Sequence, residues 1–235
     1  MAEHVIVVGG SRGLGKSFAD RLKSQGHTVS IIARTTPAGQ REGYYCCDVS
    51  QTDQIVEALG SIHRERGAIH GLACFQRFRG DGDDWDGELR VTLTATKVLI
   101  EQCVPLFANE GPRSIVLVSS VITQFISEGA SCGYHVAKAG LCQLARFFAC
   151  RLGEKGIRVN AVCPGPFVKP ETEAYYRANP AVVERIAKTS PLNRMATYED
   201  IADAVSFLLG EKSSFITGQS LVIDGGASLR WPGET

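Results

Sequence analysis

The fold of this chain is decided by the stretch Val5-Ile-Val-Val-Gly-Gly-Ser-Arg-Gly-Leu-Gly15. Its first four residues form a continuous apolar run, which is typical of a strand buried on both faces. The run ends in glycine, and a helical pattern over 13–25 follows. Glycine has no Cβ, so the backbone of this turn can approach a pyrophosphate closely, while the helix N-terminus offers unpaired N–H groups. The stretch therefore predicts a strand, a phosphate-binding turn and a helix.

Strands and helices alternate along the rest of the chain. Further strands are predicted over 28–33, 44–47, 69–75, 114–118, 157–163 and 220–223. Further helices are predicted over 52–66, 89–108, 134–153, 173–188 and 198–209, the last with Thr197 as N-cap and Asp200 in a capping box. This alternation predicts an α/β fold, in which about seven parallel strands are covered by helices on both faces. We expect one doubly wound Rossmann-type domain over residues 1–235.

Composition excludes several classes of function. The 235 residues are 44% hydrophobic and 21% charged, with a formal net charge of zero and no run of lysine or arginine. Binding to nucleic acid or to an anionic membrane therefore has no electrostatic basis. No apolar stretch approaches the roughly 20 residues that span a bilayer, and the N-terminal run is too short for a signal peptide.

The eight cysteines lie mostly inside apolar segments, and none forms a CxxC pair. They predict buried, reduced thiols rather than disulfides or metal ligands, and hence a cytoplasmic location.

The second predicted strand bears on the choice of dinucleotide. It ends in Ala33-Arg34-Thr35-Thr36, without the carboxylate that usually binds the ribose 2′-hydroxyl of NAD. Arg34 and Arg12 could bracket a 2′-phosphate with charge-assisted bonds, or they could be solvated surface residues. We favour NADP(H) over NAD(H). Asp48, which follows the third strand, is expected at the adenine edge with Val49 beside it.

A tyrosine and a lysine open the helix predicted over 134–153. Tyr134 and Lys138 are four positions apart, so the phenol and the ammonium share one helical face. A neighbouring positive charge favours the phenolate and suits the tyrosine to proton transfer, although the same spacing also occurs in structural helices. Ser119 and Ser120 end the fifth strand, at the edge where α/β sheets bind ligands. A hydroxyl there can bond to a substrate carbonyl oxygen as negative charge develops.

Further motifs follow in a fixed order. They are Arg158-Val-Asn-Ala-Val-Cys-Pro-Gly165, Thr217-Gly-Gln219 and Asp224-Gly-Gly226. With the glycine turn, the serine and the Tyr-x-x-x-Lys spacing, they resemble the short-chain dehydrogenase/reductase family, and within it the 3-oxoacyl-carrier-protein reductases. The resemblance covers the chain from Val5 to about Gly226. It implies an enzyme that interconverts a ketone and a secondary alcohol by hydride transfer.

The resemblance also assigns roles by position. Tyr134 would be the general acid/base, Lys138 would bind the nicotinamide ribose and assist the tyrosine, and Ser120, rather than Ser119, would orient the carbonyl. Ser120 precedes Tyr134 by 14 positions, one more than expected, which suggests an insertion in the connecting loop. No metal is implied. The predicted cofactor-binding residues are Gly9, Ser11, Arg12, Gly13, Leu14, Gly15, Arg34, Asp48, Val49, Cys74, Phe75, Tyr134, Lys138, Pro164, Gly165 and Phe167.

The chain departs from the family pattern at four places. Val8 replaces a threonine, Cys74-Phe-Gln-Arg77 replaces Asn-Asn-Ala-Gly, Thr92 replaces the active-site asparagine, and Lys169 replaces a threonine. Three functions stay open: a working reductase with a specialised site, a dinucleotide-binding regulatory subunit without turnover, and a sugar epimerase or dehydratase that uses the nicotinamide transiently. Retention of Ser120, Tyr134 and Lys138 favours the first.

The remaining expectations concern substrate and assembly. Arg77, Arg79 and Lys169 would add positive charge at the mouth of the cleft and suit an anionic substrate. A segment over about 166–194 is expected to cover the substrate. The helix that starts at Tyr134 carries more apolar residues than one buried stripe needs, which predicts a homodimer or homotetramer. These residues are Ala137, Ala139, Leu141, Leu144, Ala145, Phe147, Phe148, Ala149 and Leu152.

Overall fold

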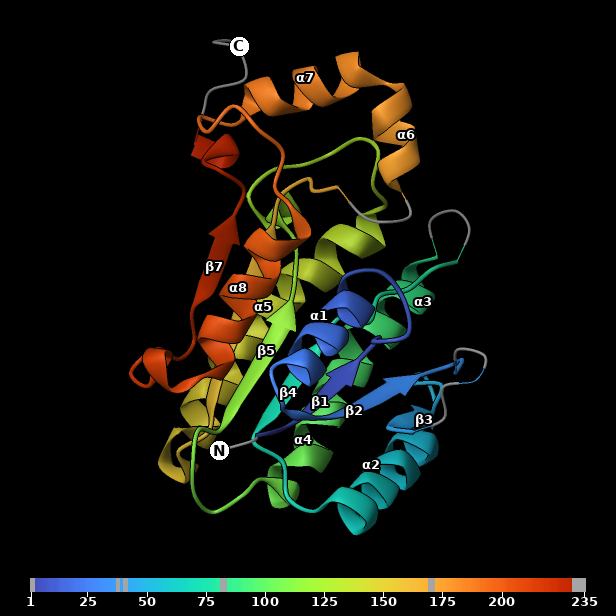
Figure 1. Cartoon of the computed structure of the whole chain (residues 1–235), viewed down its shortest axis with the longest axis vertical. Coiled ribbons are helices and arrows are strands. Elements are labelled where there is room, and N and C mark those ends of the chain that lie inside the picture. The colour runs from blue at the N-terminus through green and yellow to red at the C-terminus, as the bar shows by residue number, and fades with distance from the viewer. Residues whose placement is uncertain (1–2, 37–38, 40–41, 81–83, 169–171, 230–235) are drawn as a thin grey trace.

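The computed structural model describes residues 3–36, 39, 42–80, 84–168 and 172–229. Within them, seven parallel strands form one sheet in the order β3-β2-β1-β4-β5-β6-β7 (Figure 1). The strands are β1 His4–Val8, β2 Thr28–Ala33, β3 Tyr44–Cys46, β4 Gly71–Cys74, β5 Ser114–Val118, β6 Arg158–Pro164 and β7 Ser220–Ile223. The predicted Rossmann-type sheet is confirmed. The chain runs outward from β1 to β3 and then returns to pair β4 with the other side of β1, and ligands bind at such a reversal.

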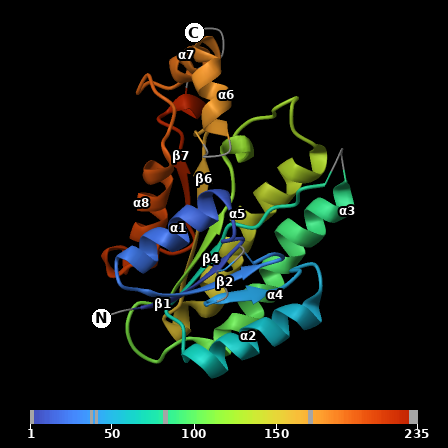
Figure 2. The same ribbon diagram turned by 45° about the vertical axis from the view of Figure 1, so that its right-hand side comes forward.

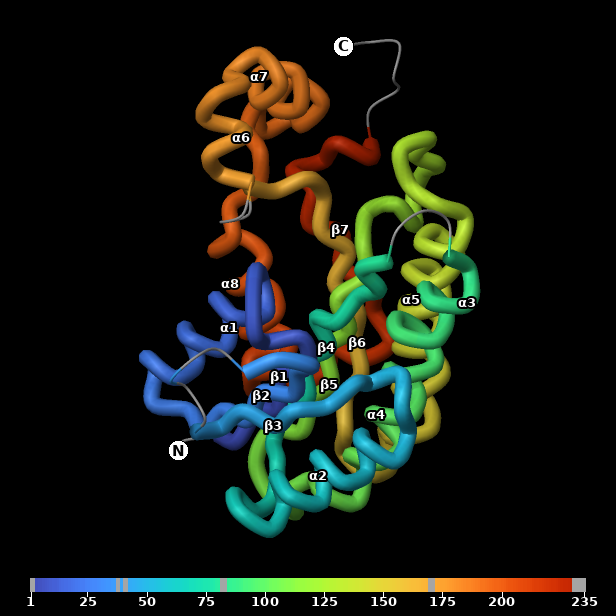
Figure 3. Tube along the Cα trace, turned by 90° about the vertical axis from the view of Figure 1, so that its right-hand side faces the viewer, coloured from blue at the N-terminus to red at the C-terminus, as the bar shows by residue number. Residues whose placement is uncertain are grey.

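Helices cover both faces of the sheet, as predicted (Figure 3). Helices α1 Gly13–Ser24 and α8 Tyr198–Leu209 lie on one face, and α2 Thr52–Arg66, α4 Ala95–Cys103 and α5 Cys132–Leu152 lie on the other. Alternate residues of β1 therefore enter different cores, Val5 and Val7 with α1 and α8, and Ile6 and Val8 with the other three helices. This double burial explains why the four residues from Val5 to Val8 are all apolar.

The helix predicted over 89–108 is longer and less regular than expected. It starts with α3 Trp85–Glu88, passes through a π-helical turn over Leu89–Thr94, continues as α4, and ends in a 3₁₀ turn over Val104–Leu106. The Asp84 carboxylate caps α3 by accepting a hydrogen bond from Gly87 N at 2.8 Å. A π-helical turn inserts an extra residue into a helix and frequently marks a functional site.

The prediction of one helix over 173–188 is wrong. Two helices, α6 Glu173–Ala178 and α7 Pro180–Thr189, meet at Asn179. Proline cannot donate the backbone hydrogen bond that would continue α6, and it disfavours helical geometry in the residue before it. Asn179 accordingly has φ −128° and ψ 64°. Both helices lie beyond the carboxyl ends of the strands (Figure 2).

Two residues of the Arg158–Gly165 motif hold the last helix and the last strand. The Arg158 guanidinium donates to the carbonyls of Leu208, Leu209 and Gly210 at 2.7, 3.0 and 2.9 Å, which satisfies the C-terminal end of α8. Asn160 donates to Ile216 O at 2.9 Å and accepts from Gln219 N at 3.0 Å. Arg158 and Asn160 therefore stabilise the fold by holding the end of α8 and the segment that leads into β7.

The cysteine prediction is partly confirmed. Cys47, Cys74, Cys103, Cys142 and Cys163 are buried free thiols. It is wrong for Cys46, Cys132 and Cys150, which are exposed because they lie at an edge strand and on the outer side of α5. In the part of the chain that the structure describes, no helix combines the length and the apolar character that a membrane crossing requires.

Candidate functional site

A cavity of about 1180 Å³ lies along the carboxyl ends of the strands. Its wall brings together the turn after β1, the ends of β2, β4, β5 and β6, and the start of α5. Among the predicted site residues, Cys74 alone does not line this cavity, because its side chain points into the core shared with α4. The predicted residues that line it are Gly9, Ser11, Arg12, Gly13, Leu14, Gly15, Arg34, Asp48, Val49, Phe75, Ser120, Tyr134, Lys138, Pro164, Gly165 and Phe167.

The glycine turn fits a phosphate group for geometric reasons. Gly9 and Gly13 have φ of +79° and +55°, in the region that favours glycine. A Cβ on Gly15 would lie 2.5 Å from Gly9 O, and a Cβ on Gly9 would lie 2.8 Å from Gln76 N. The N-cap residue of α1, Arg12, makes no side-chain cap, so the helix N-terminus is open to an anion.

The far end of the cavity is basic. The exposed side chains of Arg12 and Arg34 both line it, together with Thr35. Asp48 and Val49 follow β3 on the same wall, and Asp48 Oδ1 accepts a hydrogen bond from Ser50 N at 2.9 Å. The end of β2 and the turn after β1 therefore present two guanidinium groups to this part of the cavity.

The altered segment after β4 is held by α1 on one side and by the helical stretch over 85–106 on the other. Phe75 packs on Phe18 with ring centroids 5.3 Å apart. Gln76 Nε2 donates to Thr96 Oγ1 at 2.7 Å, and Phe78 N donates to Thr92 Oγ1 at 3.3 Å. The segment is therefore firmly placed although it lacks the residues that the family usually has there.

The two candidate proton-transfer groups meet at the start of α5. Ser131 caps the helix by accepting from Tyr134 N at 3.1 Å, so α5 begins at Cys132, two residues earlier than predicted. The Lys138 side chain is 3% exposed, and its Nζ donates to Val118 O at 2.9 Å. Lys138 Nζ lies 5.7 Å from the centroid of the Tyr134 ring. The phenol and the ammonium therefore share one side of the helix, as the spacing predicts.

The two serines after β5 differ in their hydrogen bonds. Ser119 is buried, and its Oγ donates to Lys138 O at 2.7 Å. Ser120 is half-buried, and its Oγ accepts from Ile122 N at 3.3 Å. Accepting a backbone N–H leaves the Ser120 hydroxyl proton available to a substrate oxygen, whereas the Ser119 proton is engaged.

The loop between Ser120 and Tyr134 is tied to α5 by a histidine. His135 Nε2 accepts from Ser127 N at 3.1 Å, and its Nδ1 lies 2.8 Å from Ser131 O. This contact between two loop residues and the first turn of the helix steadies the long connection.

Burial dominates the electrostatics of Lys138. It lowers the pKa of the ammonium from 10.5 to about 8, while the Glu88 carboxylate raises this pKa and the Arg77 guanidinium lowers it. Glu88 is 8% exposed and accepts a hydrogen bond from Thr92 Oγ1 at 3.2 Å. Burial raises the pKa of this carboxyl. The sequence analysis did not identify Glu88. The feature that could have pointed to it is an acidic residue four positions before Thr92, on the same helical face.

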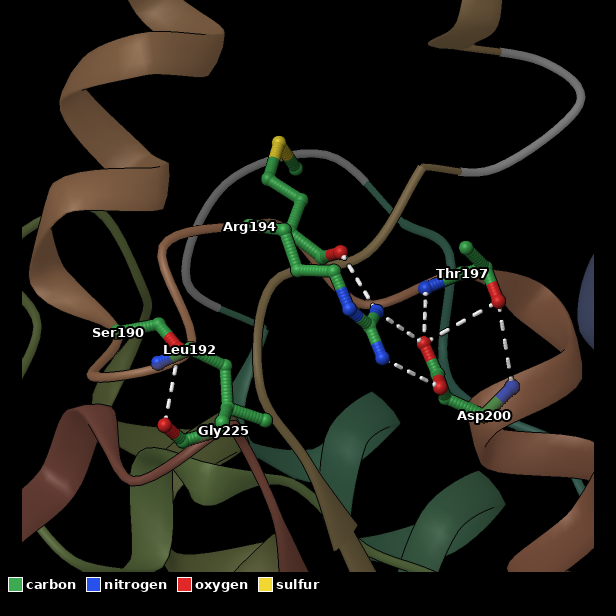
Figure 4. Close-up of polar contacts among 7 residues, drawn as sticks. Ser190, Leu192, Arg194, Thr197, Asp200 and Gly225 are labelled. Carbon is green, nitrogen blue, oxygen red and sulfur yellow. Dashed lines mark hydrogen bonds and ion pairs between the residues drawn. The ribbon is translucent and has the colours of Figure 1, made fainter.

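The segment around 166–194 is anchored at its C-terminal end (Figure 4). Asp200 accepts from Arg194 Nη1 and Nη2 at 2.6 and 2.9 Å and from Thr197 N at 2.7 Å, and Thr197 Oγ1 accepts from Asp200 N, which confirms the predicted capping box. Ser190 Oγ donates to Gly225 O at 2.9 Å. The N-terminal part of the segment contributes Pro166, Phe167, Thr172 and Tyr176 to the cavity wall. Lys169 lies outside the described residues.

Comparison with known proteins agrees with this geometry. The family model described as enoyl-(acyl carrier protein) reductase matches residues 8–228. The chain is 31% identical to the "Uncharacterized oxidoreductase C922.06" of Schizosaccharomyces pombe, over 94% of this chain and 89% of that protein. It is 29% identical to the 3-oxoacyl-[acyl-carrier-protein] reductase of Thermotoga maritima, over 94% of this chain and 96% of that protein.

Among solved structures, the aldohexose dehydrogenase of Thermoplasma acidophilum superposes with a TM-score of 0.88 and 26% identity, covering 100% of this chain and 97% of that one. The chain belongs to the short-chain dehydrogenase/reductase family and is an NAD(P)-dependent oxidoreductase.

The buried ammonium predicts a pH-dependent contribution to stability. Because the pKa of Lys138 falls to about 8 on folding, the penalty for burying its charge is relieved as pH rises from about 8 towards 10.5. In urea unfolding, the free energy of unfolding of the wild type should therefore increase over this range relative to that of Lys138→Met, by at most roughly 3 kcal/mol. The exposed Lys97 gives the control: the difference between wild type and Lys97→Met should stay flat. If the free energies of unfolding of the wild type and Lys138→Met changed in parallel with pH, the lowered pKa of Lys138 would be contradicted.

Proposed function

We propose that this protein is an NADP(H)-dependent reductase that interconverts a ketone and a secondary alcohol. The observation that carries the proposal is that Ser120, Tyr134 and Lys138 line the same cavity as the glycine turn at Gly9–Gly15. A dinucleotide bound with its diphosphate on the N-terminus of α1 would extend along this cavity towards Tyr134. Phe75, Pro164, Gly165 and Phe167 lie along the same wall and would hold its nicotinamide half.

The residues around Tyr134 supply the proton chemistry. The bound nicotinamide supplies or accepts the hydride. The Tyr134 hydroxyl gives its proton to the carbonyl oxygen in reduction and takes it back in oxidation. The Lys138 ammonium stabilises the resulting phenolate, and the Ser120 hydroxyl bonds to the substrate oxygen as its negative charge grows.

The arginines at the end of β2 support NADP(H). Arg12 and Arg34 both line the cavity, and a guanidinium bonds a phosphate in a paired, charge-assisted manner. A neutral 2′-hydroxyl would gain little from two cations.

The other two functions have less support. A binding subunit without turnover does not need Ser120, Tyr134 and Lys138 together on one wall, and the named relatives of the chain are dehydrogenases and reductases. An epimerase or dehydratase would restore the nicotinamide in each cycle, so net consumption of NADPH separates it from a reductase.

The mouth of the cavity supports an anionic substrate. Arg77, Arg79 and Arg90 line the cavity together with Asp84 and Asp86, so the described part of its lining there carries more positive than negative groups. Cations near an opening concentrate substrates of opposite charge. The segment over about 166–194 would cover such a substrate, because α6 and α7 lie beyond the strand ends and are fixed through Ser190 and Asp200.

We also infer a homo-oligomer and a cytoplasmic setting. Phe147 on α5 is 55% exposed, which supports burial of that helix against a second copy. The eight free thiols support a reducing compartment.

Replacement of the phenol tests the catalytic role. Tyr134→Phe should keep dinucleotide binding and lower kcat by about 10²- to 10⁴-fold, the usual contribution of a positioned acid. Binding is measured by thermal shift and kcat by loss of NADPH absorbance across a panel of ketones. Tyr175→Phe, on the exposed side of α6, should behave as wild type. Full activity in Tyr134→Phe would refute the role.

Replacement of Arg34 tests the cofactor preference. Arg34→Ala should weaken NADP⁺ binding about tenfold or more, the value of one lost charge-assisted hydrogen bond, and should change NAD⁺ binding much less. Calorimetric titration of both dinucleotides measures this, with Arg64→Ala on α2 as the control. Equal losses for the two dinucleotides would mean that Arg34 does not read the 2′-phosphate.

Replacement of Arg77 tests the substrate class. With two ketones that differ only in a carboxylate, Arg77→Ala should raise the ratio of the KM for the charged ketone to that for the neutral one about tenfold. Steady-state kinetics at low ionic strength measures this ratio, and Arg151→Ala provides the control. An unchanged ratio would remove the case for an anionic substrate at this mouth.

A further inference from the structure

Glu88 is a buried acid directly behind the start of α5. Helix α3, which it ends, packs so closely on α5 that a Cβ on Gly133 would lie 3.2 Å from both Glu88 Cβ and Trp85 Cα. Gly133 immediately precedes Tyr134. The Glu88 carboxylate is fixed by the hydrogen bond from Thr92 Oγ1. A carboxylate therefore lies beside the proton-transfer pair but does not line the cavity.

Several charged or titratable groups act on the pKa of Lys138. The charged or titratable groups that act on the ammonium are Glu88 on α3, Arg77 after β4, Cys142 on α5 and Cys163 on β6, and the Tyr134 ring faces it as well. Among these groups Glu88 has the largest effect in favour of the charged lysine, and Arg77 has the opposite effect. Burying an ammonium is costly unless an opposite charge balances it.

We propose that Glu88 is a positioning residue for the Tyr134–Lys138 pair, with its buried carboxylate as the countercharge that keeps the Lys138 ammonium charged beside the phenol. The proposal rests on the proposed function, in which the ammonium stabilises a phenolate. The proposal also explains two departures from the family pattern together. Thr92 holds the Glu88 carboxylate by a hydrogen bond, and the Arg77 guanidinium competes with the Lys138 ammonium for the charge of that carboxylate.

A double-mutant cycle on stability tests the pair without any assay of activity. Glu88→Gln keeps the shape of the side chain and an acceptor for Thr92 but removes the charge. In urea unfolding at pH 7, it should raise the unfolding equilibrium constant about tenfold or more in the wild-type background, because an uncompensated buried ammonium remains. In the Lys138→Met background the same change should have a several-fold smaller effect.

The surface pair Lys97 and Glu101 gives the matched control, since it joins a lysine and a glutamate at 2.7 Å on the adjoining helix. The cycle with Glu101→Gln and Lys97→Met should show almost no coupling, as exposed pairs do. Equal effects of Glu88→Gln in the two Lys138 backgrounds would show that Glu88 only fills space, and would overturn the proposal. If Glu88→Gln is too unstable to measure, recovery of folding in the double variant supports the proposal and failure to recover contradicts it.

The pH profile of turnover is a second readout that a space-filling role would not move. In the reducing direction, loss of the Lys138 charge should limit kcat at alkaline pH. Glu88→Gln should therefore shift the alkaline fall of kcat to lower pH by about one unit, with little change in KM. Arg77→Ala should shift this fall to higher pH. Glu88→Asp, which keeps the charge, should restore part of the wild-type profile. An unmoved alkaline fall in Glu88→Gln contradicts the proposal. Absence of turnover in the wild type would instead defeat the proposed function, and the stability cycle would still decide whether Glu88 balances Lys138.

Discussion

The backbone of the turn after β1 lies against the backbone that follows β4, and the rest of the site depends on this contact. Gly9 meets Gln76 N at a distance that no side chain would permit, and Gly15 meets Gly9 O in the same way. The contact forms where the strand order reverses, between β1 and β4. Because neighbouring strands there send their chains to opposite faces of the sheet, their ends separate and leave the crevice in which the cavity lies.

The other wall of the cavity is set by a buried charge. Lys138 bonds to Val118 O at the end of β5, and Ser119 bonds back to Lys138 O, so α5 and β5 are joined at the height of Tyr134. A buried ammonium would oppose folding by itself, and the Glu88 carboxylate offsets that cost. The phenol, the ammonium and the Ser120 hydroxyl are thereby held near one another by hydrogen bonds to the main chain.

Two of the departures from the family pattern, the segment after β4 and Thr92, lie together. Gln76 and Arg77 follow β4, and Thr92 lies in the π-helical turn over Leu89–Thr94. Gln76 Nε2 donates a hydrogen bond to Thr96 Oγ1, and Phe78 N donates one to Thr92 Oγ1. Two threonine hydroxyls therefore hold the altered segment in place. The change is therefore a coordinated replacement of one wall of the site.

The sequence by itself determined the elements whose signals are local. Apolar runs gave the strands, glycines gave the turn after Val8, Thr197 and Asp200 gave a capping box, and the four-residue spacing put Tyr134 and Lys138 on one face, because each of these depends only on neighbouring residues. Tertiary structure decided the rest. It turned Cys74 into the core and brought Glu88 to Lys138 across 50 positions of chain. Such a meeting follows from how whole helices pack, and packing depends on the shape of many side chains at once.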